Sequence, residues 1–431
     1  MPSASPNISL TALVAVSCLA LTAHARYILS DSFQGASFFD TFDFFTASDP
    51  TDGFVQYVDS KTAIKNELIG LVGGSQTDSS VYLGVDFKSV TTTGRQSVRI
   101  QSQQAWTHGL LVADIQASPS GCGSWPALWM LSHNPVWPGE NGEIDILEGV
   151  NNQVTNAFTL HTSAGCAVRN DSSTFSGTMS TVDCDVNDPV QPKNAGCSIT
   201  APVNDTIKMN GQVRAHSTAG PKFNTQGGGV YAMLWEADAL TFWFYPRGTV
   251  PADLAAGSSP DPSSWSQKPV AKFQGCEFDA HLSNLSIVIN QSFCGKQNWP
   301  DQVYNTGGCA AQTGVSDCTS FVGQRPGAFA NAYWLINSIK MYQETADASS
   351  SKTKRDGTPG FSLLDIPVID ISERSLPYVE KRHVPRIIEQ AQTSGAVVGV
   401  HAGLEQDRRA GVTRALVIVG FLTSVFFVAM L

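Results

Sequence analysis

Three acidic residues lie close together in the apolar stretch GEIDILEGV, residues 142–150. Glu143, Asp145 and Glu148 are separated only by isoleucine and leucine. Carboxylates grouped in this way can act as nucleophile, general acid or general base. Successive side chains of a strand point to opposite faces, so Glu143 and Asp145 should share one face while the apolar residues between them pack on the other. An isolated pair of this kind is also typical of a solvated strand face.

Glu148 is out of phase with the other two acids. In a regular strand it would point into the core, where an unpaired carboxylate is very unfavourable. A β-bulge near Ile146 and Leu147 would insert one residue and restore the phase. We therefore predict a bulge that places Glu148 beside Glu143 and Asp145, with the two glutamate carboxyl groups roughly 5–5.5 Å apart.

Aromatic residues surround the acidic stretch. Trp125 and Trp129 lie upstream on alternate positions of GSWPALWML, Trp137 follows in VWPGENGE, and His161 lies downstream in NAFTLHTSAGC. Aromatic rings stack on the apolar faces of pyranose sugars, and paired carboxylates hydrolyse glycosidic bonds. The cluster therefore predicts a sugar-binding cleft, although any single tryptophan is more often part of a core.

Short strands must position these side chains. From residue 26 to about 343 the chain is rich in short β-branched or aromatic runs, such as VYLGVDF, SVRIQS, ALTFWFY and LSIVIN, punctuated by Gly, Pro, Asn and Asp. This rhythm indicates an all-β protein, and no convincing amphipathic helix of 12 or more residues interrupts it. A body of this length predicts a two-sheet sandwich with elaborated loops.

Composition and charge limit the partners. The chain has 431 residues, of which 42% are hydrophobic and 15% charged, so it can bury a sizeable core. Its net charge is −10 and it has no long Lys/Arg run. These features argue against nucleic acid as a partner, because phosphate binding requires clustered positive charge. A neutral or cationic ligand fits better.

The N-terminus resembles an export signal. Residues 10–23 are apolar or small and are followed by Ala23-His24-Ala25, the small-x-small pattern of a signal-peptidase site. We expect residues 1–25 to be a signal peptide, with a buried first helix as the alternative. Acceptor sequons at Asn170, Asn204, Asn284 and Asn290 agree with export, although the last lies in an apolar run.

Cysteine usage also agrees with export. Removing the signal, with Cys18, leaves eight cysteines, which predict four disulfides in an oxidising compartment. They are Cys122, Cys166, Cys184, Cys197, Cys276, Cys294, Cys309 and Cys318. The sequence cannot choose among the 105 possible pairings; a local bridge between Cys309 and Cys318 is our guess. No CxxC pair appears, so we expect no zinc site.

The C-terminal part differs from the body. Residues 345–414 contain no cysteine or tryptophan and are expected to be a linker of unknown function. Residues 415–431 form an uncharged apolar run that could anchor the chain. The polar spacer before it, preceded by Ala402-Gly403, favours a lipid (GPI) anchor signal over a single spanning helix, which would leave three arginines outside.

The acidic stretch and its surroundings resemble the catalytic region of glycoside hydrolase family 16, specifically the fungal laminarinase-like endo-β-1,3(4)-glucanases. The pattern E-x-D-x-x-E after W-P-A-x-W carries the resemblance, which extends through FFDTFDFFTASDPTDGFVQYV, GGGVYAMLW, FWFYPRGTVPADL, FCG and FANAYWLINSIKMYQ. The resemblance implies that residues 26–344 are the catalytic domain. It also implies a β-jelly-roll sandwich, concanavalin A-like, with an open substrate cleft on its concave sheet.

The family pattern also implies roles for individual residues. Glu143 would be the nucleophile, Glu148 the general acid/base, and Asp145 the residue that polarises Glu143 and sets the proton balance. The residues expected to line the cleft are Trp125, Trp129, Trp137 and His161, with Trp235 of AMLW as a further candidate. A core position is the alternative for His161.

The resemblance implies a secreted, membrane-anchored endo-β-glucanase that hydrolyses β-1,3 and mixed β-1,3/1,4 glucans with retention of configuration. We expect it to act as a monomer on β-glucan without cofactor or metal, and to contact a membrane only through its tail. A glucan transglycosylase of the same family and a non-catalytic glucan-binding module are the alternatives. The chain departs from the family at Leu234 and at Lys296-Gln297, both expected near the substrate.

Overall fold

The computed structural model describes residues 27–73, 79–134, 136–203, 206–209, 212–257, 259–344 and 366–372. These residues all belong to the first of the two units into which the chain divides, residues 1–378 and 379–431. The predicted signal peptide and anchor lie outside the described residues. Within the described residues, no helix has the length and apolar character needed to cross a bilayer.

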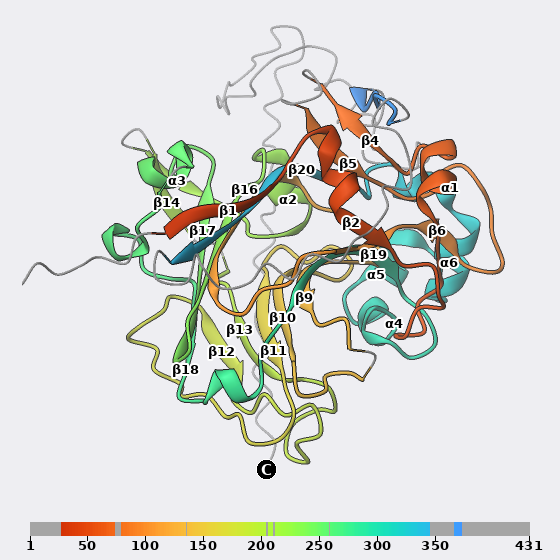
Figure 1. The fold of residues 1–431 in the computed structure, drawn as a ribbon. Coiled ribbons are helices and arrows are strands. Elements are labelled where there is room, and N and C mark those ends of the chain that lie inside the picture. Colours follow the sequence, from red (N-terminus) through yellow and green to blue (C-terminus); the bar gives the residue numbers. More distant parts are fainter. Residues whose placement is uncertain are drawn as a thin grey trace, which may run out of the picture. The chain divides into compact units, whose positions relative to one another are not determined.

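Two antiparallel sheets of eight strands each form the structure (Figure 1). The first sheet has the order β18-β17-β16-β8-β20-β5-β4, with β1 paired to β20. Its strands are β18 (Ala271–Gln274), β17 (Ala239–Pro246), β16 (Gly229–Trp235), β8 (Gly109–Ala117), β20 (Trp334–Glu344), β5 (Ser80–Leu83), β4 (Ile69–Val72) and β1 (Tyr27–Phe33).

The second sheet carries the acidic stretch and has the order β12-β13-β11-β10-β9-β19-β7-β2. Its strands are β12 (Thr178–Thr181), β13 (Cys197–Thr200), β11 (Ala157–His161), β10 (Glu143–Glu148), β9 (Ser124–Leu131), β19 (Ser286–Phe293), β7 (Arg99–Ser102) and β2 (Phe42–Phe44). Two small pairs complete the strands: β14 (Thr206–Met209) with β15 (Gln212–Ala215), and β3 (Val55–Tyr57) with β6 (Arg95–Ser97).

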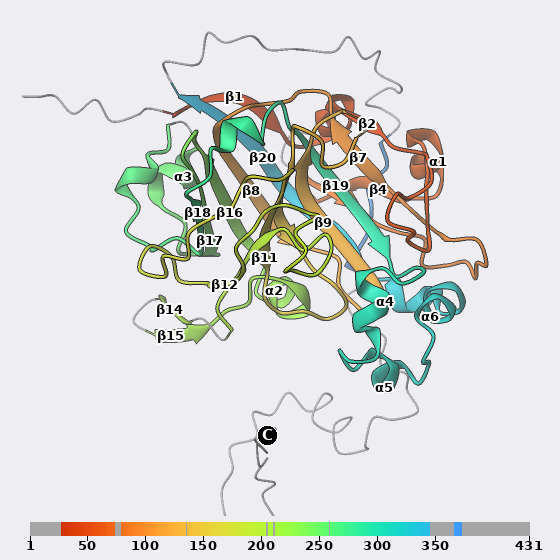
Figure 2. The same ribbon diagram turned by 90° about the horizontal axis from the view of Figure 1, so that it is seen from below.

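One hydrophobic cluster joins the inner faces of the two sheets. Ile115 and Phe242 enter it from the first sheet, and Leu128 and Ile144 enter it from the second. Along β9 and β10 these residues alternate with Trp129 and Glu143, which therefore lie on the opposite face of the second sheet. The predicted all-β, two-sheet sandwich is confirmed as a β-jelly roll, seen from below in Figure 2.

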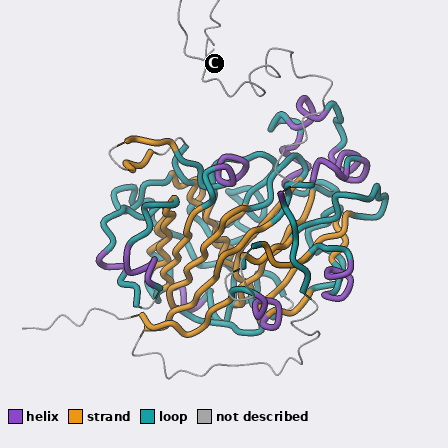
Figure 3. Tube along the Cα trace, turned by 90° about the horizontal axis from the view of Figure 1, so that it is seen from above, coloured by secondary structure: helices purple, strands orange, loops and turns teal. Residues whose placement is uncertain are grey.

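Helices in the described residues are short, and they lie around the strands (Figure 3). They are α1 (Ser60–Lys65), α2 (Gly220–Thr225), α3 (Ala252–Ala256), α4 (Trp299–Tyr304), α5 (Cys309–Thr313) and α6 (Cys318–Gln324), with 3-10 turns η1 (Ala36–Thr41), η2 (Pro262–Ser264), η3 (Phe278–Ala280) and η4 (Pro326–Phe329). Figures 1 and 2 both place α4, α5 and α6 together at one side of the strands.

Four disulfides connect the eight body cysteines, as the sequence predicts. They are Cys122–Cys309, Cys166–Cys276, Cys184–Cys197 and Cys294–Cys318. The guessed pairing of Cys309 with Cys318 is wrong. These two residues begin the separate helices α5 and α6. Cys309 bonds to Cys122 just before β9 and Cys318 bonds to Cys294 just after β19, two neighbouring positions at the same end of the second sheet.

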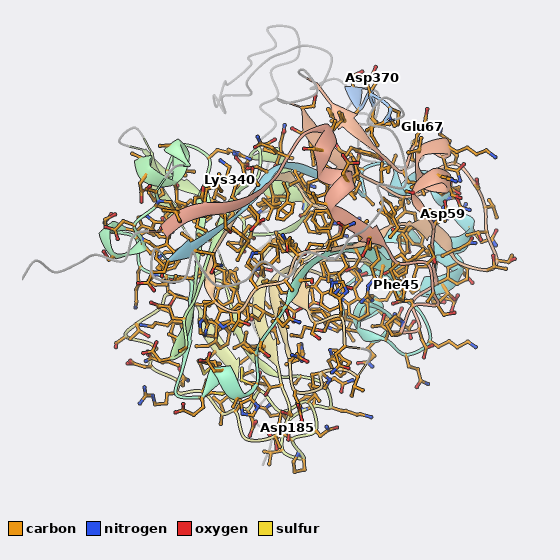
Figure 4. The ribbon with its side chains drawn as sticks, viewed as in Figure 1. Phe45, Asp59, Glu67, Asp185, Lys340 and Asp370 are labelled. Atoms are coloured by element: carbon orange, nitrogen blue, oxygen red, sulfur yellow. A yellow bond between two sulfur atoms is a disulfide. The ribbon has the colours of Figure 1, made fainter. Side chains whose placement is uncertain are left out.

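Part of the expected linker packs against the first sheet. Residues 366–372 lie beside β4, and Asp370 marks them in Figure 4. The N–H of Leu71 donates to the carbonyl of Pro367 at 2.9 Å, and the N–H of Ile369 donates to the carbonyl of Leu71 at 2.7 Å. Ile369 is buried, so this segment covers the edge of β4. The stretch expected to be a linker, residues 345–414, therefore contains a short segment that docks on the first sheet.

Ile369→Asp should release this segment from β4. A charged side chain cannot occupy the site where Ile369 is 4% exposed, so we expect the free energy of unfolding to fall by about 1–3 kcal/mol. Val368→Asp is the matched control, because Val368 is 79% exposed and should tolerate the charge. Denaturant unfolding measures both variants, and equal losses would contradict the docking. Activity should survive in both, since β4 does not belong to the acid-bearing sheet.

Candidate active site

A β-bulge interrupts β10 at the predicted place. The register between β10 and β9 pairs Asp145 with Trp129 and then Leu147 with Leu128, which leaves Ile146 as the extra residue. Ile146 and Leu147 are both buried in the core cluster. The bulge therefore keeps the apolar residues inside and leaves Glu148 half-buried on the other side, next to Ala127. This confirms the phase correction that the sequence requires.

Glu143 is held by an indole and faces a histidine. Trp137 Nε1 donates to Glu143 Oε2 at 2.6 Å. His161 is the cross-strand partner of Glu143 in β11, and its Nε2 lies 3.9 Å from Glu143 Oε1. The ring of Trp137 lies 5.7 Å from that of His161. Two neighbouring strands and the loop before β10 thus orient this carboxyl group.

Asp145 lies between the two glutamates and is almost completely buried. Trp129 and Thr159 are its cross-strand partners. His161 Nε2 lies 3.2 Å from Asp145 Oδ2, closer than it lies to Glu143. A protonated His161 would form an ion pair with Asp145 at this distance. His161 therefore lies beside the acids rather than in the hydrophobic core.

Glu148 is held by a second indole. Trp125 Nε1 donates to Glu148 Oε1 at 2.8 Å. The backbone N–H of Glu148 donates to Asn156 Oδ1 at 2.9 Å. Trp125 in turn lies edge-on to Trp299 of α4, with ring centroids 6.2 Å apart. Each glutamate therefore receives a hydrogen bond from a different tryptophan.

Burial raises the pKa of all three acids, each to about 8. The charge of Asp145 raises the pKa of Glu143 and Glu148 further, while the indole donors and His161 lower both. Neighbouring carboxylates cannot all ionise freely, so the three groups share protons over the acid and neutral range. This arrangement can keep one carboxyl protonated near neutral pH while another carries a negative charge.

The raised pKa values predict a fall in stability with rising pH. An acid that binds its proton more tightly when folded contributes its full stability below its unfolded pKa, and loses it as the pH rises through its folded pKa. For Asp145 this window runs from about 4 to about 8. Asp145→Asn should therefore melt at least about 3 °C above the wild type at pH 9.

Calorimetry at pH 5 and pH 9 tests this expectation. Glu140→Gln, which changes an exposed acid of the same region, serves as the control and should follow the wild type at both pH values. A wild type that keeps the same melting temperature from pH 5 to pH 9 would contradict the raised pKa values of the buried acids.

The structure brings four of the five predicted aromatic residues to the acids. Trp125, Trp129, Trp137 and His161 all lie on the acid-bearing face or contact an acid. Trp235 does not. It ends β16 in the first sheet, is 1% exposed and belongs to the core cluster, so its predicted place in the cleft is wrong.

The two departures from the family pattern have different positions. Leu234 also lies on β16, where it packs in a separate cluster with Leu110 and Trp243. Its expected place near the substrate is therefore wrong as well. Lys296 and Gln297 are exposed in the loop between β19 and α4, and Asn298 separates them from Trp299. They remain candidates for substrate contact.

Three residues that were not predicted to belong to the site also contact its tryptophans: Arg99, Asn290 and Trp299. The Arg99 guanidinium lies 4.9 Å from the Trp129 ring centroid and 4.6 Å from that of Phe45. Asn290 Oδ1 accepts from Trp129 Nε1 at 2.7 Å, so this sequon asparagine is buried and engaged. Strand pairing brings Arg99 and Asn290 to Trp129, whereas Trp299 of α4 reaches the site through its ring contact with Trp125.

Among the residues that the structure describes, Glu143, Asp145 and His161 form a group that could hold a cation. Each offers a ligand atom, and these atoms all lie within 4.8 Å of one another. The ligands would be two carboxylates and one imidazole. Those same carboxylates are the groups available for acid/base and nucleophilic chemistry.

A two-sheet sandwich with paired glutamates on one bulged strand, each bonded to an indole, has the carboxylate pair that glycoside hydrolysis requires. The family model described as "XgeA-like, catalytic GH16 domain" matches residues 42–342. The chain therefore belongs to glycoside hydrolase family 16, as the resemblance in the sequence indicated.

Curated relatives agree with this family. An endo-1,3(4)-beta-glucanase of Arthroderma benhamiae is 41% identical over 340 residues, which span 78% of this chain and 68% of the relative. A probable endo-1,3(4)-beta-glucanase of Aspergillus fumigatus is 38% identical over 356 residues, or 81% of this chain. The chain spans only about half the length of that second relative, since the match covers 50% of it.

Solved structures agree too. Laminarinase 16A from Phanerochaete chrysosporium, with β-glucans in its donor and acceptor sites, is 37% identical with a TM-score of 0.64, covering 74% of this chain and 100% of its own. An elongating family 16 β-1,3-glucosyltransferase is 36% identical with the same TM-score of 0.64 and the same coverage of both chains.

Proposed function

We propose that this glycoside hydrolase is an endo-β-glucanase that cleaves β-1,3 and mixed β-1,3/1,4 glucans with retention of configuration. The observation that supports this most directly is the bulge in β10, which places Glu148 on the same side as Glu143 and Asp145. The names of the relatives, endo-1,3(4)-beta-glucanases among them, support the substrate class.

The site suggests a role for each acid. Glu143 attacks the anomeric carbon, while Glu148 donates a proton to the departing glycosidic oxygen; the bond between carbon and that oxygen breaks as the glycosyl-enzyme forms. Glu148 then takes a proton from the water that attacks the same carbon and releases Glu143. Asp145 sets how the protons are distributed between the two glutamates.

The aromatic residues would hold the polysaccharide along the acid-bearing face. Trp125 lies on the side of Glu148, which protonates the departing sugar, whereas Trp137 lies on the side of Glu143, which bonds the retained sugar. Trp129 lies opposite Asp145 between them. A glucan chain crossing all three would occupy both sides of the cleaved bond, as an endo-acting enzyme requires.

Incubation with laminarin tests hydrolysis against the two alternatives. New reducing ends mean hydrolysis, and this is the result we expect. Redistribution of chain lengths without new ends would favour a transglycosylase, a candidate supported by the similarity to an elongating β-1,3-glucosyltransferase. Binding without either change would mean a non-catalytic glucan-binding module and would overturn the proposal.

We also propose that the protein is exported and held at the cell surface through its C-terminal tail. The support comes from the sequence, in which a signal-like segment at residues 1–25 and an apolar run at 415–431 flank the catalytic unit. Phosphatidylinositol-specific phospholipase should release a lipid-anchored protein from cells. Release by detergent alone would favour a spanning helix, and free secretion would contradict anchoring.

A further inference from the structure

Asn156 occupies a special position next to the bulge. It directly precedes β11, which pairs with β10 at Glu143, Ile144 and Asp145. Beyond Asp145, β10 no longer pairs with β11. There the side chain of Asn156 makes the hydrogen bonds to the β10 backbone that a neighbouring strand would otherwise make. Its Oδ1 accepts from the N–H of Glu148 at 2.9 Å, and its Nδ2 donates to the carbonyl of Ile146 at 2.8 Å.

Both backbone groups that Asn156 satisfies belong to the bulge. Ile146 is the extra residue, and Glu148 is the residue whose face the bulge corrects. A regular pairing without the extra residue would turn the Glu148 side chain toward the opposite face of the sheet. The single carboxamide bridges the two residues on either side of Leu147 and so fixes the bulged conformation.

Asn156 is itself held rigidly. Its side chain is completely buried, its backbone N–H donates to Thr218 Oγ1 at 2.7 Å, and its carbonyl accepts from the N–H of Ala201 at 2.8 Å. Thr218 is also anchored, because its carbonyl accepts a hydrogen bond from Tyr231 of β16. The backbone that carries the carboxamide is therefore held by contacts that do not involve the acids.

We propose that Asn156 is the positioning residue for the general acid/base: it holds the bulge that aims the carboxyl of Glu148 at the glycosidic oxygen. This inference rests on the role proposed for Glu148 above. Asn156 need not touch substrate. Its loss should therefore impair proton transfer more than binding or nucleophilic attack.

Comparison of two substrates tests this proposal. Cleavage of laminarin needs a proton on a poor leaving group, whereas cleavage of a 2,4-dinitrophenyl β-laminaribioside does not. For Asn156→Ala we expect kcat/KM on laminarin to fall about 100-fold, as when general acid catalysis is lost, but to fall less than about tenfold on the aryl glycoside. Equal losses on both substrates would overturn the proposal and leave a purely structural role.

Asn224→Ala is the matched control. Asn224 in α2 makes the same pair of bonds to the backbone of Ser118, accepting at 2.9 Å and donating at 2.8 Å, but contacts no residue of the bulge. Its variant should leave the ratio of the two activities unchanged. Glu148→Gln, measured alongside, separates the two claims. If it lacks the substrate dependence, the proposed function fails; if it has that dependence and Asn156→Ala does not, only this inference fails.

Asn156→Asp keeps the test available should the alanine variant not fold. A protonated carboxyl group can accept from Glu148 and donate to Ile146 just as the carboxamide does, whereas an ionised one cannot donate. We expect laminarin hydrolysis within threefold of wild type at pH 5 and a loss beyond that of wild type by pH 8. A profile parallel to that of the wild type at both pH values would overturn the proposal.

Discussion

Replacing Glu143 with glutamine should reduce glucan hydrolysis by roughly 10⁴-fold or more, the scale seen when a covalent nucleophile is removed. The amide can still accept the hydrogen bond from Trp137, which Glu143 receives at 2.6 Å, so the strand and its bulge should be retained. What is lost is the negative oxygen that bonds the anomeric carbon. Reducing ends released from laminarin measure the loss, and Glu140→Gln, an exposed acid nearby, should keep full activity.

Two further measurements assign the chemical role of Glu143. A 2-deoxy-2-fluoro glycoside with a good leaving group should label this residue in the wild type, and mass spectrometry of peptides should locate the label. In Glu143→Ala, azide can enter the vacated space and displace the leaving group once, which inverts the configuration and gives an α-azide. A label on Asp145 or Glu148 instead would contradict the assignment.

Local pattern was sufficient to predict the acids and the bulge. The phase of a strand is a property of a few residues, and burying Glu148 alone would be so unfavourable that only an extra residue could resolve it. Ile146 and Leu147 are apolar, so the extra residue had to keep both of them in the core and turn Glu148 to the face of the other acids. Trp125 and Trp129 followed from the same alternation along one strand.

Residues from distant strands could not be predicted in this way. Arg99 and Asn290 reach Trp129 because β7, β19 and β9 are neighbours in the second sheet, and Asn290 is 161 residues from Trp129 in the sequence. The prediction that Trp235 lines the cleft failed because its strand, β16, belongs to the other sheet, where the Trp235 side chain faces the core. Strand order, which local periodicity does not contain, decides both cases.

The disulfide pairing and the docking of residues 366–372 could not be predicted for the same reason, because both depend on contacts between segments that are distant in the sequence. Cys309 and Cys318 are near in sequence, but they begin two separate short helices and bond to Cys122 and Cys294, which flank neighbouring strands of the second sheet. Residues 366–372 follow a polar stretch and were therefore predicted to belong to a linker. In the structure this segment lies beside β4, and Ile366 and Ile369 are buried. Composition averages over a segment and so misses a few apolar residues whose partners lie far away.

Replacing Glu148 should have a smaller and more selective effect. Proton transfer by a positioned side chain contributes about 10²–10⁴-fold, so Glu148→Gln should lose that much activity on laminarin and far less on substrates with good leaving groups. The basic limb of the wild-type pH profile should also disappear in this variant. Burial raises the pKa of Glu148 to about 8, so the wild type keeps its acid protonated at neutral pH and loses activity as the pH rises through that value.

The stereochemistry of rescue distinguishes Glu148 from Glu143. In Glu148→Ala the glycosyl-enzyme still forms on activated substrates, but no base remains to activate water. Azide needs no such base, so it should accelerate turnover and give a β-azide, the product of two inversions, where Glu143→Ala gives an α-azide. Proton NMR of the wild-type product before mutarotation should likewise show the β-anomer. An initial α-anomer would mean that water attacks directly, which requires carboxyl groups farther apart than the bulge in β10 is proposed to place them.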